Sequence, residues 1–294
     1  MKVRSILKLV GIAAAASLML GVAAQAPATA ASKNVYKLLW NQEFNGKKGT
    51  APNPKWWEYD MGLGPNGEKQ YYTQLRKNSA TDGKGNMLLT ARVITETDPL
   101  YSYCMPDVVD NCWYSSARLK SSGKVGFKYG MMVARIKMPK GKGAWPAFWM
   151  LGQSINDGVS WPHCGEIDIV EAKGEPNNQV FGTAHGPDYS GGQGIGDMFI
   201  NTAPLSDDYH TYSIRWKPNR VEWYFDNKLY HTLTPNSVWG NEYVFNDEFF
   251  LILNLAMGGL FVGDIDPYNV PKAEMAVDYI RYYSVNGVGK VIKY

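Results

Sequence analysis

The sequence of 294 residues lacks several features that mark common protein classes. It has three cysteines and no CxxC pair, which argues against a zinc ribbon or a thioredoxin-like redox site. Its four histidines show no metal-ligand spacing, and neither a GxSxG nor an HExxH motif occurs. No internal repeat or low-complexity tract interrupts the chain. These absences leave a globular protein whose chemistry has to come from other side chains.

Excess charge and long apolar runs are also scarce once the N-terminus is set apart. Residues 1–30 carry Lys2, Arg4 and Lys8 but no acid, then an apolar run over 9–24 and small residues up to Ala30. This is the order of a secretory signal peptide. The remainder has 27 Lys and Arg against 27 Asp and Glu, with no second run of membrane-spanning length. We therefore expect a secreted, extracellular, single-domain monomer over 31–294 without nucleic-acid or membrane partners.

Aromatic residues are abundant, with 10 Trp, 19 Tyr and 10 Phe. Helical periodicity is rare, whereas short alternating or apolar runs bounded by turn residues are common, as is typical of strands. The pair Asp226-Asn227 predicts a hairpin turn within 221–233, and the almost wholly apolar run 249–257 predicts a central strand. The fold class predicted is an all-β sandwich or barrel of antiparallel strands. The strand runs that we identify are 131–138, 211–216, 221–233, 249–257 and 277–283.

The cysteines fit an exported protein. Cys104 and Cys112 bracket a short polar loop and are predicted to form a disulfide, which the extracellular environment permits. Cys164 is then unpaired, and we interpret it as a buried free thiol.

Three acids lie close together in the segment CGEIDIVEAKG at 164–174. The β-branched residues between them favour a strand, in which Glu166 and Asp168 face the same side with Cα atoms about 6.6 Å apart. Glu171 has the wrong parity for that face. A β-bulge at about Ile169-Val170 would restore it, because one extra residue reverses the alternation. The prediction is three carboxyl groups on one concave face.

Neighbouring carboxylates repel one another, so at least one of the three should have a raised pKa. A pair divided into an ionised carboxylate and a protonated acid is what glycoside hydrolysis requires. The alternatives are a Ca²⁺ site with oxygen ligands and an ordinary solvated strand face. The apolar flanking segments WPAFWM and WPHCG argue against a solvated face.

The motif EIDIVE resembles the signature of glycoside hydrolase family 16 in its bulged form, in particular the bacterial laminarinase-like endo-β-1,3-glucanases. Further segments fit the family in order along most of the chain after the signal peptide. They are LLWNQEF at 38–44, GNMLLTAR at 85–92, YSSARLKSSGK at 114–124, GKGAWPAFWML at 141–151, FGTAHGPDYSGG at 181–192, FFLILNLAMGG at 249–259 and VDYIRYY at 277–283.

This resemblance implies a concanavalin-like β-jelly-roll sandwich of two antiparallel sheets with a concave substrate cleft. It also implies a retaining mechanism in which Glu166 is the nucleophile, Asp168 its helper and Glu171 the acid/base. No cofactor is implied for catalysis. One structural Ca²⁺ is implied on the convex side, held by Glu43, the carbonyl of Gly85 and Asp278. Alternation predicts that Asp278 faces away from its neighbours Val277 and Tyr279.

Several residues near the acids are candidates for substrate binding. Trp145 and Trp161 are expected to stack on sugar rings, and Trp149 is a third candidate for which we favour a place in the sandwich core. The resemblance assigns a sugar contact to Arg118 and a place near the acid/base to His185.

Two further candidates are asparagines. Asn254 interrupts an apolar strand and needs partners, of which a substrate hydroxyl is one. Asn66 lies in the segment 62–73, which resembles the family's cleft loop but departs from it at Leu63 and Pro65-Asn66. This departure leaves the choice of substrate open.

The sequence thus predicts a secreted retaining endo-glycosidase acting on β-1,3-glucan. Mixed-linkage β-glucan and β-galactan are alternative substrates, and transfer to a sugar instead of water is an alternative outcome. A glycan-binding module without catalysis and a calcium-dependent adhesion domain are the alternatives from other classes.

Overall fold

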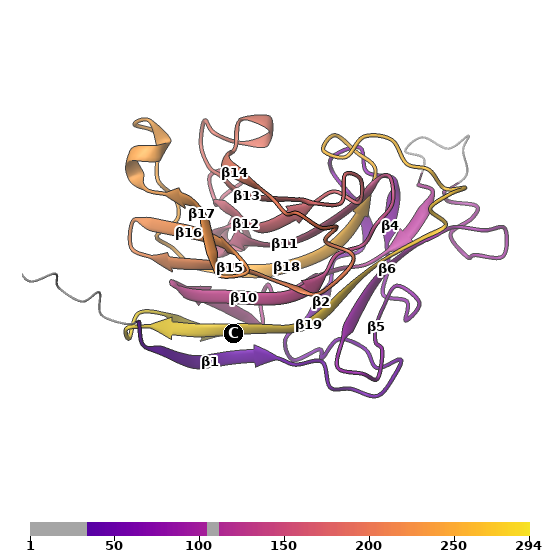
Figure 1. Cartoon of the computed structure of the whole chain (residues 1–294), viewed down its shortest axis with the longest axis horizontal. Helices are drawn as coiled ribbons and strands as arrows, with labels where there is room; N and C mark the ends of the chain where they lie inside the picture. Colours follow the sequence, from indigo (N-terminus) through magenta and orange to yellow (C-terminus); the bar gives the residue numbers. More distant parts are fainter. Residues whose placement is uncertain (1–33, 105–111) are drawn as a thin grey trace, which may run out of the picture. The chain divides into compact units, whose positions relative to one another are not determined.

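The structure is a computed structural model that describes residues 34–104 and 112–294. Its strands form two β-sheets (Figure 1). The predicted signal peptide lies outside these residues and stays a prediction. Residues 34–294 form one compact unit. None of the helical segments among the described residues has the length and hydrophobicity of a membrane-spanning helix. Short 3-10 turns occur at Gln153–Asp157, Gly191–Gln193 and Pro235–Val238.

The larger sheet has 11 strands. Its main path runs β17 (Lys228–Leu233), β16 (Arg220–Phe225), β15 (His210–Lys217), β10 (Gly130–Lys137), β19 (Lys272–Val285), β6 (Met87–Val93), β7 (Tyr114–Ser116), β4 (Gln70–Tyr72) and β3 (Gly62–Leu63). Two more strands join at the side, with β1 (Tyr36–Gln42) on β19 and β5 (Ser79–Thr81) on β6.

The second sheet carries the acids on β12. Its path runs β14 (Ile195–Ile200), β13 (Gln179–His185), β12 (Glu166–Ala172), β11 (Ala144–Gly152), β18 (Phe249–Met257), β8 (Arg118–Lys120) and β2 (Glu58–Tyr59). The strand β9 (Val125–Lys128) pairs with β18 and with β20 (Lys290–Lys293). Figure 1 shows β13, β12, β11 and β18 side by side. Among the described residues every pairing is antiparallel except β4 with β7. The predicted two-sheet, all-β fold is therefore confirmed, with one parallel pair added.

The core lies between the two sheets. It is formed by the side chains that point inward from each strand. Tyr212, Ile214 and Trp216 on β15 are all buried, as the alternation predicted, and every residue of β18 is buried. The hairpin turn at Asp226-Asn227 is confirmed by positive φ angles of 44° and 64° at the two residues, as a type I′ turn requires.

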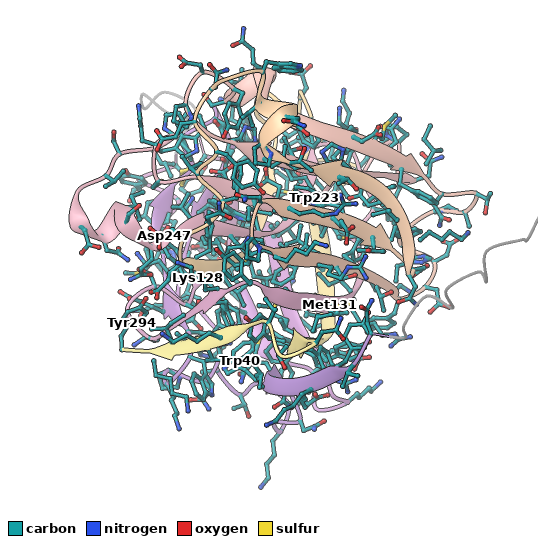
Figure 2. The ribbon with its side chains drawn as sticks, turned by 90° about the vertical axis from the view of Figure 1, so that its left-hand side faces the viewer. Trp40, Lys128, Met131, Trp223, Asp247 and Tyr294 are labelled. Carbon is teal, nitrogen blue, oxygen red and sulfur yellow. A yellow bond between two sulfur atoms is a disulfide. The ribbon has the colours of Figure 1, made fainter. Side chains whose placement is uncertain are left out.

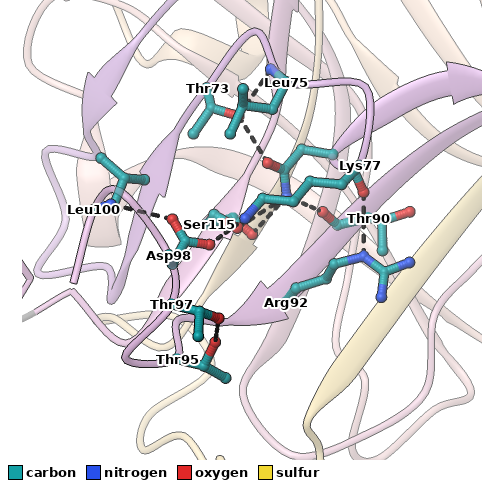
Figure 3. A network of polar contacts seen from close by, with 11 residues as sticks. Thr73, Leu75, Lys77, Thr90, Arg92, Thr95, Thr97, Asp98, Leu100 and Ser115 are labelled. Atoms are coloured by element: carbon teal, nitrogen blue, oxygen red, sulfur yellow. Dashed lines mark hydrogen bonds and ion pairs between the residues drawn. The ribbon is translucent and has the colours of Figure 1, made fainter.

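A buried polar network links the end of the short strand β4 to β6 and β7 (Figure 3). The side chain of Asn78, fully buried, donates to the carbonyls of Thr90 on β6 and Ser115 on β7 at 2.9 and 3.0 Å. Its own oxygen accepts from the Thr73 hydroxyl at 2.7 Å. Because Thr73 directly follows β4, this network fixes the strand that presents Tyr72.

Candidate active site

The three acids share one face of β12 because the strand is bulged. Asp168 lies opposite Trp149 of β11 and Val170 lies opposite Phe148, which leaves Ile169 as an extra residue. The pairing with β13 shows the same shift between Asp168 and Glu171. Ile169 and Val170 are both buried in the core, at 1% and 0% exposure. The predicted bulge is confirmed, and it turns Glu171 to the side of Glu166 and Asp168.

The backbone of this bulge is anchored from the opposite sheet. Trp223 of β16, labelled in Figure 2, is fully buried and donates its indole N–H to the carbonyl oxygen of Asp168 at 2.7 Å. A bulge leaves backbone groups without ladder partners, and a buried carbonyl needs a donor. This contact therefore fixes the backbone at the point where the alternation changes.

The carboxyl groups open into a cleft of about 560 Å³ over β12, β11, β18 and β8. Of the residues that the sequence singled out for catalysis or substrate binding, the structure places all but His185 along it. These are Asn66, Arg118, Trp145, Trp149, Trp161, Glu166, Asp168, Glu171 and Asn254. The sequence reasoning did not single out Asp60, Glu68 and Tyr72, which also line the cleft.

Tryptophan indoles hold the two outer carboxyl groups. The indole N–H of Trp145 donates to Glu171 Oε1 at 2.8 Å, and that of Trp161 donates to Glu166 Oε2 at 2.9 Å. Hydrogen bonds to a charged acceptor are stronger than those to a neutral one, so these donors favour the ionised carboxylates. Each indole therefore orients one carboxyl group, in addition to the sugar stacking expected from the sequence.

Trp149 lies in the cleft, so the core position favoured for it is wrong. It stands opposite Asp168 in the ladder, and its indole N–H donates to Asn254 Oδ1 at 2.7 Å. Alternation along β11 places Trp145 and Trp149 on one face and Phe148 and Met150 on the buried face. The period of two could have given this result from the sequence.

A short network links Asn254 to residues that the sequence reasoning missed. Asn254 donates to the Tyr72 hydroxyl at 3.2 Å, and that hydroxyl donates to Glu68 Oε2 at 3.1 Å. Arg118 lies 4.9 Å from the Tyr72 ring and pairs with Asp60 at 2.6 Å. Asn254 thus has protein partners, and Arg118 is a wall residue of the cleft whose charge is balanced by Asp60.

Burial is the main influence on the three acids. It raises the pKa of Glu166, Asp168 and Glu171 to about 8 in each case. For the two glutamates, repulsion by Asp168 adds to the rise, while the indole donors oppose it. Because the three groups interact, they lose protons in steps, and each ionisation makes the next less favourable. At intermediate pH the cluster therefore holds both a carboxylate and a protonated acid, as expected from the sequence.

His185 lies beside the first two acids. It stands opposite Glu166 in the ladder, and its Nε2 lies 3.1 Å from Asp168 Oδ2 and 3.8 Å from Glu166 Oε1. These three side chains are the one group among the described residues that could hold a metal ion. The direct contacts of His185 are therefore with Asp168 and Glu166, and its charge also lowers the pKa of the acid/base Glu171, as the expectation that it lies near that residue implied.

Two of the three positions expected to hold calcium are paired with arginines. Both carboxylate oxygens of Glu43 accept from Arg281 at 2.8 Å, which lowers the pKa of Glu43, and Asp278 accepts from Arg135 at 2.6 Å. Each carboxylate is paired with a guanidinium in this structure, and the calcium site stays a prediction. Gly85 lies between β5 and β6 with a φ of 98°.

The predicted orientation of Tyr279 is wrong. Asp278 is an extra residue in the pairing of β19 with β10, where Arg135 faces Tyr279 and Ile136 faces Val277. This bulge turns Tyr279 outward together with Asp278, so alternation fails at this point.

The cysteines are arranged as expected. Cys104 and Cys112 form a disulfide. Cys164 is buried and unpaired, and its burial raises the pKa of the thiol to about 11. A thiol that stays protonated is a poor nucleophile, so Cys164 has a packing role.

Comparison with known proteins is consistent with this geometry. The pattern that defines the glycosyl hydrolases family 16 matches residues 67–281. The chain belongs to glycoside hydrolase family 16. It is 35% identical over 262 residues to a beta-glucanase of Rhodothermus marinus, a match that covers 84% of this chain and 85% of that one.

Solved structures of family 16 enzymes share the fold. The laminarinase catalytic domain of Thermotoga maritima MSB8 is 40% identical with a TM-score of 0.75, covering 85% of this chain and 98% of that one. The endo-beta-1,3-glucanase of Pyrococcus furiosus is 40% identical with a TM-score of 0.76, covering 85% and 95% respectively. Family 16 membership makes this chain a glycoside hydrolase with a jelly-roll fold.

Proposed function

We propose that this protein is a secreted, retaining endo-β-1,3-glucanase. The observation that carries the proposal is the row of three carboxyl groups along one face of the bulged strand β12, with an indole donor on each outer glutamate. The substrate is proposed from the relatives named laminarinase and endo-beta-1,3-glucanase, each of which covers 85% of this chain. Secretion is proposed from the signal-peptide pattern of residues 1–30.

The proposed first step uses Glu166 and Glu171 in opposite protonation states. Glu166 attacks the anomeric carbon as a carboxylate, while Glu171 gives its proton to the leaving oxygen. The bond from the anomeric carbon to the leaving oxygen breaks, and an ester to Glu166 forms. Asp168 lies between the two glutamates and raises the pKa of both, which helps keep Glu171 protonated.

In the second step Glu171, now a carboxylate, takes a proton from water. The water oxygen bonds to the anomeric carbon, the ester to Glu166 breaks, and both glutamates return to their starting states. Two displacements at one carbon retain its configuration.

The test is a product profile of the purified protein lacking residues 1–30. Its panel holds β-1,3-glucan, mixed-linkage β-glucan, β-1,4-glucan, agarose and β-1,3-galactan, with Glu166→Gln as the blank. Short oligosaccharides from β-1,3-glucan, absent in the blank, support the proposal. Release from a galactan alone would keep the mechanism and replace the substrate. No release from any glycan would refute the hydrolase function and favour a glycan-binding module.

Azide distinguishes the roles of the two glutamates. With an activated aryl glycoside, Glu166→Ala should give the α-glycosyl azide, because azide enters on the face that the nucleophile vacates. Glu171→Ala should give the β-glycosyl azide, because azide attacks the ester on the opposite face. The reverse pattern would exchange the two assignments.

A further inference from the structure

Two aromatic side chains without a role in the proposed mechanism, Phe181 and Phe261, lie near Glu171. Phe261 follows β18, and its ring centre lies 5.2 Å from that of Trp145 and 5.0 Å from that of Phe181 on β13. Phe181 stands directly opposite Glu171 in the β12–β13 ladder, so both side chains are on the cleft face of the sheet. Phe181 and Phe261 are only partly buried, which leaves surface for a ligand.

A cation completes this group. Lys173 is two residues beyond Glu171 on the chain, and its Nζ lies 4.5 Å from the ring centre of Phe261 and 5.5 Å from that of Phe181. Met198, 39% exposed, stands opposite Phe181 on β14 and extends the apolar surface. A sugar needs an apolar surface for its C–H face and polar donors for its hydroxyls. The rings and the ammonium group together supply both.

The loop that carries Phe261 is held in place. Gly258 and Gly259 have φ angles of 70° and 99°, a left-handed conformation that suits glycine. A Cβ on Gly259 would come within 2.8 Å of the Asn66 carbonyl oxygen, and that oxygen accepts from the Leu260 N–H at 3.0 Å. The loop is therefore packed against the cleft wall at Asn66.

The position of this group relative to the cleft indicates which sugar it meets. The cleft of about 560 Å³ extends from β12 over β11, β18 and β8, and its described lining includes no residue of β13 or β14. Glu171 is at its β12 border. A glycan chain that fills the cleft and continues past Glu171 therefore crosses β13, where Phe181 lies.

We propose that Phe181, Phe261 and Lys173 form the binding site for the sugar on the leaving-group side of the scissile bond. The proposal rests on the proposed glucanase function. The same site holds the acceptor in transfer: the acceptor hydroxyl oxygen bonds to the anomeric carbon, its proton goes to Glu171, and the ester to Glu166 breaks. The site therefore sets both the rate on oligosaccharides and the ratio of transfer to hydrolysis.

The test compares substrates with and without a leaving-group sugar. For Phe181→Ala and Phe261→Ala we expect kcat/KM on laminarihexaose to fall about tenfold or more, because binding energy at this sugar is used in the transition state. On β-laminaribiosyl fluoride, which has no sugar there, kcat/KM should stay within about twofold. Tyr268→Ala is the matched control, since Tyr268 is on the same loop and 93% exposed, and should change neither substrate.

A second readout is the transfer ratio. The donor is β-laminaribiosyl fluoride and laminaribiose is the added acceptor. At equal amounts of hydrolysis, Phe181→Ala and Phe261→Ala should form less transfer product than the wild type. Phe181→Leu and Lys173→Gln test the same site with less risk to folding, the first keeping apolar volume without the flat ring and the second removing the ammonium charge.

Each outcome decides the proposal. An equal loss on both substrates would mean that the changes disturb the fold or the donor side of the cleft, and would overturn the proposal. A loss on laminarihexaose alone with an unchanged transfer ratio would mean that the rings act through Trp145 on the acid Glu171, because the fluoride needs no acid to leave, and would overturn it too. Unchanged kinetics on laminarihexaose in all four variants would also overturn it. A wild-type protein that cleaves neither substrate would refute the glucanase function itself, which is a distinct result.

Discussion

The indole N–H groups of Trp145 and Trp161 should control opposite limbs of the pH profile of kcat/KM. Trp145→Phe keeps an aromatic ring but removes the N–H that donates to Glu171 at 2.8 Å, and Trp161→Phe does the same to Glu166 at 2.9 Å. A hydrogen bond to a charged group contributes about 1.5–3 kcal/mol, and 1.36 kcal/mol corresponds to one pH unit, so each carboxyl pKa should rise by about one to two.

The sign differs because the two glutamates work in opposite states. Glu171 must be protonated in the first step, so a higher pKa of Glu171 carries the basic limb of kcat/KM to higher pH. Glu166 must be ionised, so a higher pKa of Glu166 carries the acidic limb to higher pH and narrows the profile. The apparent pKa values of the two limbs belong to the coupled cluster of three acids and not to single residues. The decisive observation is therefore the direction in which each limb moves.

The assay is kcat/KM on laminarihexaose for the wild type and both variants between about pH 4 and pH 10. Trp149→Phe is the matched control, because its indole N–H donates to Asn254 and should leave both limbs in place. Unmoved limbs in both variants would refute the claim that the indoles tune the carboxyl groups. Movement of the acidic limb by Trp145→Phe would refute the assignment of Glu171 as the acid.

Three further predictions concern stability. The folded-state pKa of Glu171 is raised to about 8, so its contribution to stability is present below the unfolded value and is lost as pH rises toward 8; Glu171→Gln should therefore raise the melting temperature at pH 8 more than at pH 5. Equal effects at both values would contradict this reasoning. Because Arg281 and Arg135 already pair with Glu43 and Asp278, millimolar Ca²⁺ or a chelator should leave the melting temperature unchanged, and a rise of several degrees with Ca²⁺ would support the calcium site. Replacing both disulfide cysteines by Ser should lower the free energy of unfolding by about 2–3 kcal/mol in denaturant titrations, and no loss would show that the bridge adds nothing.

Local patterns were sufficient for the catalytic strand. The spacing of Glu166, Asp168 and Glu171 requires one extra residue if all three are to share a face, and the β-branched residues between them favour a strand. The bulge at Ile169-Val170 follows from these two facts, since side chains alternate with a period of two. The hairpin at Asp226-Asn227 is another local result, because the turn residues themselves adopt the required φ angles.

The error at Tyr279 depended on a partner strand. The outward turn of Tyr279 results from a bulge against β10, and the spacing of residues on β19 alone gives no sign of it. The calcium ligands were expected from motif positions and stay a prediction; nothing in the sequence indicated that their carboxylates pair with Arg135 and Arg281, which are distant in sequence from Asp278 and Glu43 respectively.

The fold class, the carboxyl row on β12 and the family resemblance could all be predicted from the sequence, because these depend on residues close together in the chain. Three contacts could be seen only in the folded chain: which indole donates to which carboxyl group, the hydrogen bond from Asn254 to Tyr72, and the packing of Phe261 on Phe181. Such contacts join segments up to 182 residues apart, as for Asn254 and Tyr72. Strand order and loop packing bring these segments together, and no spacing within a single strand encodes them.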